Sequence, residues 1–421
     1  MSSFVIKKKS MWQWILIFLL FQAHDSALYI VYNTAFTAVS LLTIFYVGTR
    51  YGYVRSKRIA IALLLLLTDV FFVRILNSGG IGLGIFIRWA TQLLLAYVAV
   101  EIDSDYFIDR FSKFVTFMAV VSLLFYVVSL SNTSIIKAIS LFQYSPWEGA
   151  THYGGLLYTL TTGYTRNTSV FNEPGLYQIV LNSALFFMMF YQDRIYCKER
   201  TKTYMAAVLI ITLLTTQSTN AYLGMLVIIL CYMFQNKQKN AKFKIVLAFM
   251  ILFGVLIVDF AQNGESSLFY RVVLKKLSEI NHDTRSDYIV TSGQARWITI
   301  QMCMQSIIKH PLGIGIDKYN LELRRGFLHA DVAVAAVLFS MAAQIGVVPV
   351  VIMVRSFLKK IWRNKECIAS FIAVSFLFFN TLLGQSDFFY PAIWILMFAC
   401  KKGRIIHEST LDVQSATQPG I

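Results

Sequence analysis

The stretch that opens with Ser292-Gly-Gln-Ala-Arg-Trp297 is the longest hydrophilic interruption in the sequence. It continues through His310-Pro-Leu-Gly-Ile-Gly315 and ends with Gly346 inside the next apolar run. Apolar runs surround it on both sides, each close to the roughly 20 residues that a helix needs to cross a membrane. A polar stretch between such runs is expected to lie at a membrane surface, and it is where we expect the chemistry.

The composition is that of a polytopic membrane protein. Hydrophobic residues make up 57% of the chain and charged residues only 14%, which is outside ordinary globular usage and excludes a single soluble core. The net charge of +16 could suggest nucleic acid, but the basic residues fall in short clusters between apolar runs, as in cytoplasmic loops. We therefore expect no nucleic-acid partner. The five scattered cysteines offer no disulfide framework.

Twelve apolar runs are predicted to span the membrane. They are 11–23, 28–48, 59–76, 85–101, 114–131, 174–191, 204–216, 220–234, 245–260, 330–354, 368–385 and 388–400. When the termini and alternate loops are assigned to the cytoplasm, 25 of the 38 Lys and Arg residues lie on that side, and the short loops opposite contain none. The sequence thus predicts an all-α polytopic fold of about 12 transmembrane helices with both termini cytoplasmic.

This topology divides the chain into six parts. They are helices 1–5 over 1–131, a first outward loop over 132–173, helices 6–9 over 174–260, a large outward loop over 261–329, helices 10–12 over 330–400 and a cytoplasmic tail over 401–421. The large loop contains an amphipathic segment in which Trp297, Ile300, Met304 and Ile307 share one face. We expect that segment to end near Pro311 and to cover a cavity at the outer surface.

His329 stands where the large loop meets the tenth run, with Asp331 two residues further on. Histidine is the side chain whose ordinary pKa suits proton transfer near neutral pH, so His329 is a candidate general base. A histidine at a membrane interface is the alternative interpretation. Arg296, Arg324 and Arg325 lie in the same loop, and guanidinium groups bind phosphate oxygens through paired hydrogen bonds. They indicate an anionic lipid-linked substrate, unless they only neutralise acidic headgroups.

Arg166 and Glu173 close the first outward loop. Glu173 before Pro174 can cap the following helix, but capping does not explain Arg166, so both are candidates for a pocket. Arg74 and Arg88 lie in or at the outer ends of the third and fourth runs, where an ion pair and a phosphate site both fit the sequence. No HExxH, DxD, P-loop or GxGxxG motif is present, so we expect neither a metal nor a nucleotide cofactor.

Taken together, these pieces resemble the O-antigen polymerase and O-antigen ligase superfamily of bacterial envelope enzymes. The matching residues are Arg166 with Phe171-Asn-Glu-Pro-Gly175, Thr216-Gln-Ser218, Ala295-Arg-Trp297, His310-Pro-Leu-Gly-Ile-Gly315 followed by Tyr319, and Leu328-His329 leading to Gln344-Ile-Gly346. Many ligase-type members carry Asn or Ser directly after the motif histidine, whereas this chain has Ala330.

The resemblance implies glycosyl transfer from undecaprenyl-pyrophosphate-linked oligosaccharides at the periplasmic face of the bacterial inner membrane, without a metal or cofactor. It implies that His329 deprotonates or positions the acceptor hydroxyl and that Arg166 and Arg296 hold the pyrophosphate or stabilise its departure. With Glu173, which its position singles out, His329 and Arg296 are the catalytic candidates. Substrate binding is assigned to Arg166, Arg324, Arg325, Arg74, Arg88 and Tyr319. Membrane lipid, a chain-length regulator and a flippase are the implied partners. A repeat-unit polymerase is the first interpretation, a ligase that transfers the glycan to lipid A core is the second, and a flippase or transporter is the alternative from another class.

Overall fold

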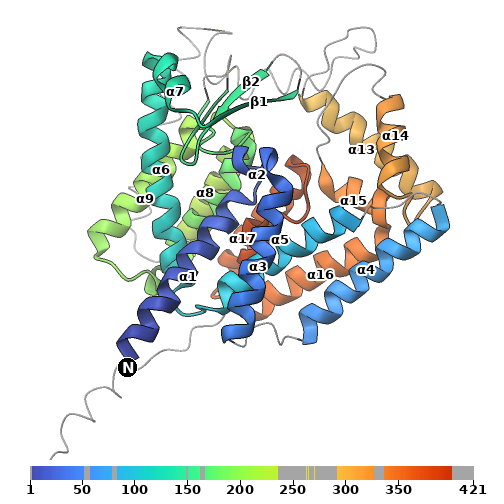
Figure 1. Ribbon diagram of the computed structural model, residues 1–421, viewed down its shortest axis with the longest axis horizontal. Helices are drawn as coiled ribbons and strands as arrows, with labels where there is room; N and C mark the ends of the chain where they lie inside the picture. The colour runs from blue at the N-terminus through green and yellow to red at the C-terminus, as the bar shows by residue number, and fades with distance from the viewer. Residues whose placement is uncertain are drawn as a thin grey trace, which may run out of the picture.

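The computed structural model describes residues 2–51, 57–77, 83–147, 150–161, 166–235, 262, 264, 270, 292–326 and 336–400. Most of these residues are helical, which confirms the helical character predicted for the fold (Figure 1). The ninth predicted span, 245–260, and the tail 401–421 lie outside the described residues.

Most of the described helices overlap the predicted apolar runs, although the run 28–48 is divided at Tyr32 into two helices. Their bounds are α1 (Ser2–Gln22), α2 (Ala27–Val31), α3 (Asn33–Tyr51), α4 (Lys57–Asn77), α5 (Leu83–Glu101), α6 (Phe107–Ser131), α7 (Thr133–Ile139), α8 (Pro174–Phe190), α9 (Glu199–Thr215), α10 (Thr219–Gln235), α13 (Ser292–Lys309), α14 (Ile316–Gly326), α15 (Val337–Ile345), α16 (Val347–Asn364), α17 (Ile368–Gly384) and α18 (Pro391–Ala399). By length and composition, α5 and α6 are the two described helices that could cross a membrane, and shorter apolar helices include α8, α10 and α17. The figure of about 12 spans therefore stays a prediction.

The long helices run alternately between two ends of the molecule, which we call the upper and lower ends as drawn in Figure 1. At the upper end, the N–H of Asn167 donates to the carbonyl of Thr215 at 3.1 Å, where α9 ends. At the lower end, Arg194 pairs with Glu366 at 3.3 Å, and Lys113 donates to the carbonyl of Tyr196 at 3.1 Å. The loops rich in Lys and Arg between α8 and α9 and between α16 and α17 thus meet at the lower end.

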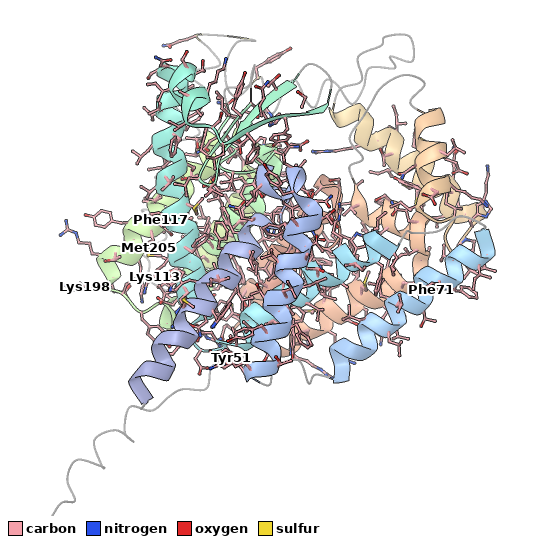
Figure 2. The ribbon with its side chains drawn as sticks, viewed as in Figure 1. Tyr51, Phe71, Lys113, Phe117, Lys198 and Met205 are labelled. Carbon is pink, nitrogen blue, oxygen red and sulfur yellow. The ribbon has the colours of Figure 1, made fainter. Side chains whose placement is uncertain are left out.

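Large apolar side chains remain exposed on the sides of the helices. Phe117 on α6 and Phe71 on α4 are 58% and 47% exposed and lie on opposite sides of the molecule, with Lys113 and Lys198 on the side of Phe117 and Tyr51 near the bottom (Figure 2). Exposed apolar surface of this extent marks a protein that contacts lipid or another protein.

A three-stranded antiparallel sheet at the upper end departs from the all-α prediction. Its strands β1 (Phe142–Trp147), β2 (Ala150–Gly154) and β3 (Thr159–Thr161) pair in chain order, with Tyr144 opposite His152 and His152 opposite Thr161. The aromatic and β-branched residues that make this loop rich in Tyr and Thr also favour strands. The Tyr144 hydroxyl donates to the side-chain carbonyl of Asn172 at 3.0 Å, so the sheet contacts the segment that leads into α8.

The tenth predicted span, 330–354, is not one helix. It is divided at Gly346, where φ is +94°, into α15 and α16. The segment after α13 fills the break, because the N–H groups of Ile314 and Gly315 donate to the carbonyls of Ala343 and Gln344 at 2.9 and 3.0 Å. A Cβ on Gly346 would lie 2.9 Å from the carbonyl of Leu312. Only glycine permits both this conformation and this close approach, which the continuous apolar pattern did not indicate.

Helix α13 ends at Lys309, just before Pro311, as predicted, but it buries a different face. Thr299, Cys303 and Ser306 are buried, whereas Trp297 and Met304 are 54% and 43% exposed. The small side chains allow α13 to pack closely against α15. Of the predicted apolar face, Trp297 and Met304 therefore stay on the surface, whereas Ile300 and Ile307 are half-buried.

Candidate functional site

A turn between α1 and α2 forms the base of a polar cluster at the upper end. Asp25 has a left-handed backbone conformation with φ of 54°, which Asp tolerates better than most residues. The turn is fixed to the segment before α8, since the N–H of Ala27 donates to the carbonyl of Val170 at 2.9 Å and that of Asn172 to the carbonyl of Asp25 at 3.4 Å. The Asp25 side chain is thereby held in one place, half-buried.

His24 joins the C-terminus of α1 to the N-terminus of α18. Its Nδ1 lies 2.8 Å from the carbonyl oxygen of Leu20, and its Nε2 accepts the backbone N–H of Ala392 at 2.6 Å. These partners assign the proton to Nδ1 and leave Nε2 as an acceptor, so the imidazole is neutral. Burial lowers the pKa of His24 from 6.5 to about 3, and this histidine therefore serves the structure and not proton transfer.

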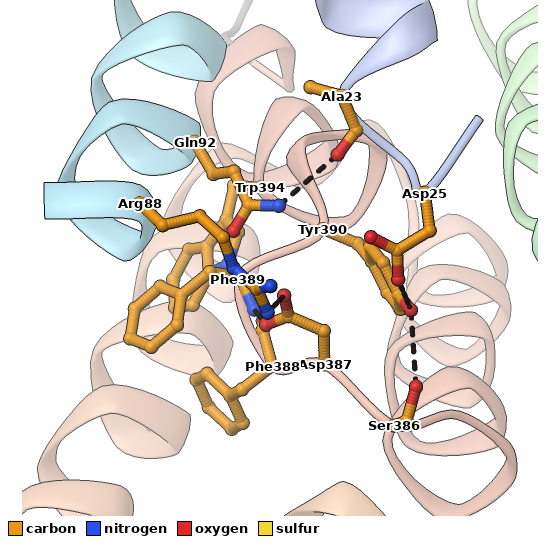
Figure 3. Close-up of polar contacts among 10 residues, drawn as sticks. All are labelled: Ala23, Asp25, Arg88, Gln92, Ser386, Asp387, Phe388, Phe389, Tyr390 and Trp394. Carbon is orange, nitrogen blue, oxygen red and sulfur yellow. Dashed lines mark hydrogen bonds and ion pairs between the residues drawn. The ribbon is translucent and has the colours of Figure 1, made fainter. Parts of the chain in front are cut away.

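The loop before α18 forms two polar contacts, one between Tyr390 and Asp25 and one between Asp387 and Arg88 (Figure 3). The Tyr390 hydroxyl donates to Asp25 Oδ2 at 2.7 Å and lies 3.3 Å from the hydroxyl of Ser386. Arg88 on α5 pairs with Asp387 at 3.1 Å, and Asp387 also accepts the backbone N–H of Phe389 at 2.9 Å. Burial is the main cause that raises the pKa of Asp25, and the Arg88 guanidinium opposes it.

Glu173 stands at the N-cap position of α8, with Pro174 in the first turn, but its side chain makes no capping hydrogen bond. The half-buried carboxyl group is left for other contacts. Burial raises its pKa and Asp25 adds to that rise, whereas the nearby guanidinium groups of Arg296 and Arg166 lower it. The Glu173 carboxyl group is therefore influenced by charged groups from three segments: Asp25 of the turn, Arg166 of the first loop and Arg296 of α13.

Arg296 reaches this cluster from α13. Its Nη2 lies 3.5 Å from the carbonyl oxygen of Gly384 at the end of α17. The adjacent Gln385 donates to the carbonyl of Gly175 at 2.9 Å, so the end of α17 also contacts the start of α8. Burial lowers the pKa of Arg296, and the Glu173 carboxylate opposes that shift. Among the described residues, the carbonyl of Gly384 is the one hydrogen-bond acceptor of the Arg296 guanidinium group.

The structure thus brings Arg88, Arg166, Glu173 and Arg296 to one end, but not every predicted residue joins them. Tyr319 is buried in a separate cluster with Ile314 and Ala343, and its hydroxyl lies 3.5 Å from the Cys303 sulfur. The backbone of Arg74 lies on α4 and those of Arg324 and Arg325 in the last turn of α14, but their side chains lie outside what the structure describes. His329 and Asp331 are outside the described residues.

Four members of the cluster were missed by sequence reasoning. They are His24, Asp25, Asp387 and Tyr390. Asp25 and Tyr390 are 365 residues apart in the chain, so no local pattern relates them. A usable signal did exist, because Asp25 and Asp387 are acidic residues at the ends of apolar runs, where a charge needs a partner.

The cluster combines three guanidinium groups with three carboxyl groups. Arg88 and Asp387 neutralise each other, whereas Arg296, Arg166 and Glu173 are half-buried and make no ion pair within 4 Å among the described residues. Such an arrangement can bind a multiply charged anion through the arginines and can accept a proton on a carboxylate whose pKa is raised. In the described residues, no three His, Cys, Asp or Glu side chains are grouped to hold a metal ion.

Comparisons of the chain with protein-family models, with curated proteins and with solved structures gave no match.

Proposed function

We propose that this protein is a membrane glycosyltransferase that polymerises undecaprenyl-pyrophosphate-linked oligosaccharide repeat units at the periplasmic face of the bacterial inner membrane. The product is O-antigen, capsule or exopolysaccharide. The observation that carries the proposal is that Arg296 and the start of α8, where Glu173 lies, both contact the end of α17: Arg296 lies 3.5 Å from the carbonyl of Gly384, and Gln385 donates to the carbonyl of Gly175 at 2.9 Å. Arginines in a partly buried site suit a diphosphate leaving group.

In the proposed reaction, the bond between the anomeric carbon of the donor glycan and the diphosphate oxygen breaks. A hydroxyl of the acceptor repeat unit forms the new bond to that carbon and loses its proton to a base. Undecaprenyl pyrophosphate leaves with the bonding electron pair, and Arg296 and Arg166 stabilise its charge. The sugar passes through an oxocarbenium-like state. We assign the base to His329 on the resemblance, and the positioning of the acceptor hydroxyl to Glu173.

The distribution of charge supports the orientation. Arg110, Lys113, Arg194 and Lys202 lie near the lower end, where each contacts a carboxylate. Basic loops favour the cytoplasmic side, so the cluster around Glu173 faces the periplasm. Lipid-linked repeat units are polymerised on that side in the superfamily that the sequence resembles.

A ligase that transfers the glycan to lipid A core would use the same donor chemistry and is the second candidate. A transporter has less support, because discontinuous helices in transporters present free backbone groups to a substrate. Here the carbonyls of Ala343 and Gln344 at the helix break accept the N–H groups of Ile314 and Gly315, and Val347 donates to the carbonyl of Pro311. The break is closed by the chain itself.

The test is made in cells that lack the chromosomal gene and carry it on a plasmid. Arg296→Ala, Arg166→Ala, Glu173→Gln and His329→Ala are each expected to shorten or abolish the ladder of glycan lengths on a gel while protein levels stay normal. Arg200→Ala is a matched control, because Arg200 is exposed on α9 toward the lower end.

A ladder that is unchanged in the Arg296 and Glu173 variants would refute the site. Single repeat units on the acceptor, with loss of longer chains, indicate a polymerase. Full-length glycan that accumulates on its lipid carrier indicates a ligase instead.

A further inference from the structure

An apolar groove of about 820 Å³ lies on the side of the molecule along α16, away from the polar cluster. Its walls come from α13, α15 and α17, through residues such as Met304, Phe339 and Phe379. The volume is within the range of about 300–1,000 Å³ that is usual for small-molecule sites. The exposed face of α13 that carries Met304 lines this groove, so a molecule bound in the groove would cover that face.

The floor of the groove changes character along its length. Val347, Val351, Arg355 and Lys359 are spaced by four residues on α16 and therefore share one face. The first two are apolar, whereas the last two are exposed cations that also line the groove. Neither Arg355 nor Lys359 makes an ion pair in the part of the chain that the structure describes. The groove therefore has an apolar end and a cationic end.

The length of this face matches one leaflet of a bilayer. From Val347 to Lys359 the helix rises by about 18 Å, and half of a hydrocarbon core is about 15 Å. Trp362, which is 51% exposed, lines the groove one turn beyond Lys359. Tryptophan is enriched where hydrocarbon meets headgroups. The cationic end also points toward the lower end of the molecule, where α16 leads to the basic residues around Glu366.

We infer that this groove binds an anionic phospholipid of the cytoplasmic leaflet, with an acyl chain along Val347 and Val351 and the phosphate at Arg355 and Lys359. The inference rests on the membrane orientation in the proposed function and not on glycosyl transfer. An undecaprenyl chain fits less well, because it is longer than the groove and its diphosphate belongs at the opposite end, near Arg296. A phospholipid accounts for both the apolar and the cationic end.

The test measures lipid retention by the purified full-length protein. The protein in mild detergent is titrated with phosphatidylglycerol or phosphatidylcholine of the same acyl chains, and bound lipid is counted by native mass spectrometry. Phosphatidylglycerol is expected to bind more tightly, and Arg355→Gln with Lys359→Gln is expected to weaken it about 30-fold, as two cations at a membrane surface imply. The binding of phosphatidylcholine should change little.

Two further variants complete the test. Arg363→Gln with Lys198→Gln removes the same charge from exposed positions outside the groove and should leave binding unchanged. Val351→Trp fills the groove without a change of charge and should weaken both lipids, which keeps the test open if the double variant does not fold. Equal binding of the two lipids by the wild type, an effect of the control as large as that of R355Q/K359Q, or a groove occupied by another segment of this chain would overturn the inference. An unaltered lipid preference combined with an unaltered glycan ladder in the Arg296 variant would refute the proposed function alone.

Discussion

Replacement of His24 by glutamine should remove the part of the acid-induced loss of stability that comes from protonation of this histidine. His24 is held neutral because its Nε2 accepts the N–H of Ala392, and protonation would place two N–H groups against each other. Its pKa falls from 6.5 to about 3. Below pH 6.5 His24 binds a proton in the unfolded chain but not in the folded protein, so the free energy of unfolding decreases by about 1.4 kcal/mol for each pH unit. The loss is about 2 kcal/mol at pH 5 and at most about 5 kcal/mol near pH 3.

The assay compares the wild type with His24→Gln in the same detergent from pH 7.5 to pH 4. Glutamine can donate to the carbonyl of Leu20 and accept from Ala392, but it does not titrate. The two proteins should have similar unfolding midpoints at pH 7.5, and the wild type should lose more as the pH falls through 6.5. Because carboxyl groups such as Asp25 titrate in both proteins, the difference between the curves isolates the histidine. Parallel curves over this range would refute the assigned tautomer and its cost.

Three other predictions concern separate parts of the molecule. Gly346→Ala should lower the free energy of unfolding by about 1–3 kcal/mol, because φ is +94° there. Gly84→Ala is the control, because a Cβ at that position meets nothing within 4 Å, and equal unfolding midpoints for the two variants would contradict the account of the helix break. Asp387→Asn should lower the free energy of unfolding by about 1–3 kcal/mol, since it leaves the half-buried Arg88 without its ion-pair partner. In a double-mutant cycle Arg88→Gln should recover part of that loss, and strictly additive effects would show that the two residues do not interact. Arg296→Lys keeps the charge but loses the planar fork, so it should shorten the glycan ladder with an unfolding free energy within about 0.5 kcal/mol of the wild type; a full-length ladder would argue against phosphate binding.

Much of the helical framework could be predicted from apolar runs and charge. The end of α13 before Pro311 and the start of α8 at Pro174 follow from local rules for proline. The break at Gly346 could not be predicted, because the residues on both sides are apolar and the cause lies in the segment 310–315 that packs against it. The sheet was missed because strand pairing between Tyr144 and His152 depends on partners that only the folded loop defines.

The candidate site was predicted in part. Residue type and position single out Arg296 and Glu173, and the structure brings Arg296 and the start of α8 to the same end of α17. Asp25 was not singled out, since its partner Tyr390 lies at the other end of the chain. Tyr319 was included through a motif, yet the fold buries it beside Cys303. Contacts between segments that are far apart in the chain decide which polar residues come together, and such contacts leave no local pattern in a single sequence.

The closed break between α15 and α16 has a consequence for the reach of Arg296. Because the turn after Lys309 is fastened to the carbonyls of Ala343 and Gln344, α13 is fixed at one end and carries the arginine about 20 Å away, at 1.5 Å per residue. A tilt of about 3° at this attachment would move the guanidinium group by about 1 Å, and a displacement of that size can reduce a reaction rate about 100-fold. Under the proposed function, substitutions at the glycines of this junction would therefore lower the rate of glycosyl transfer without touching any residue of the polar cluster.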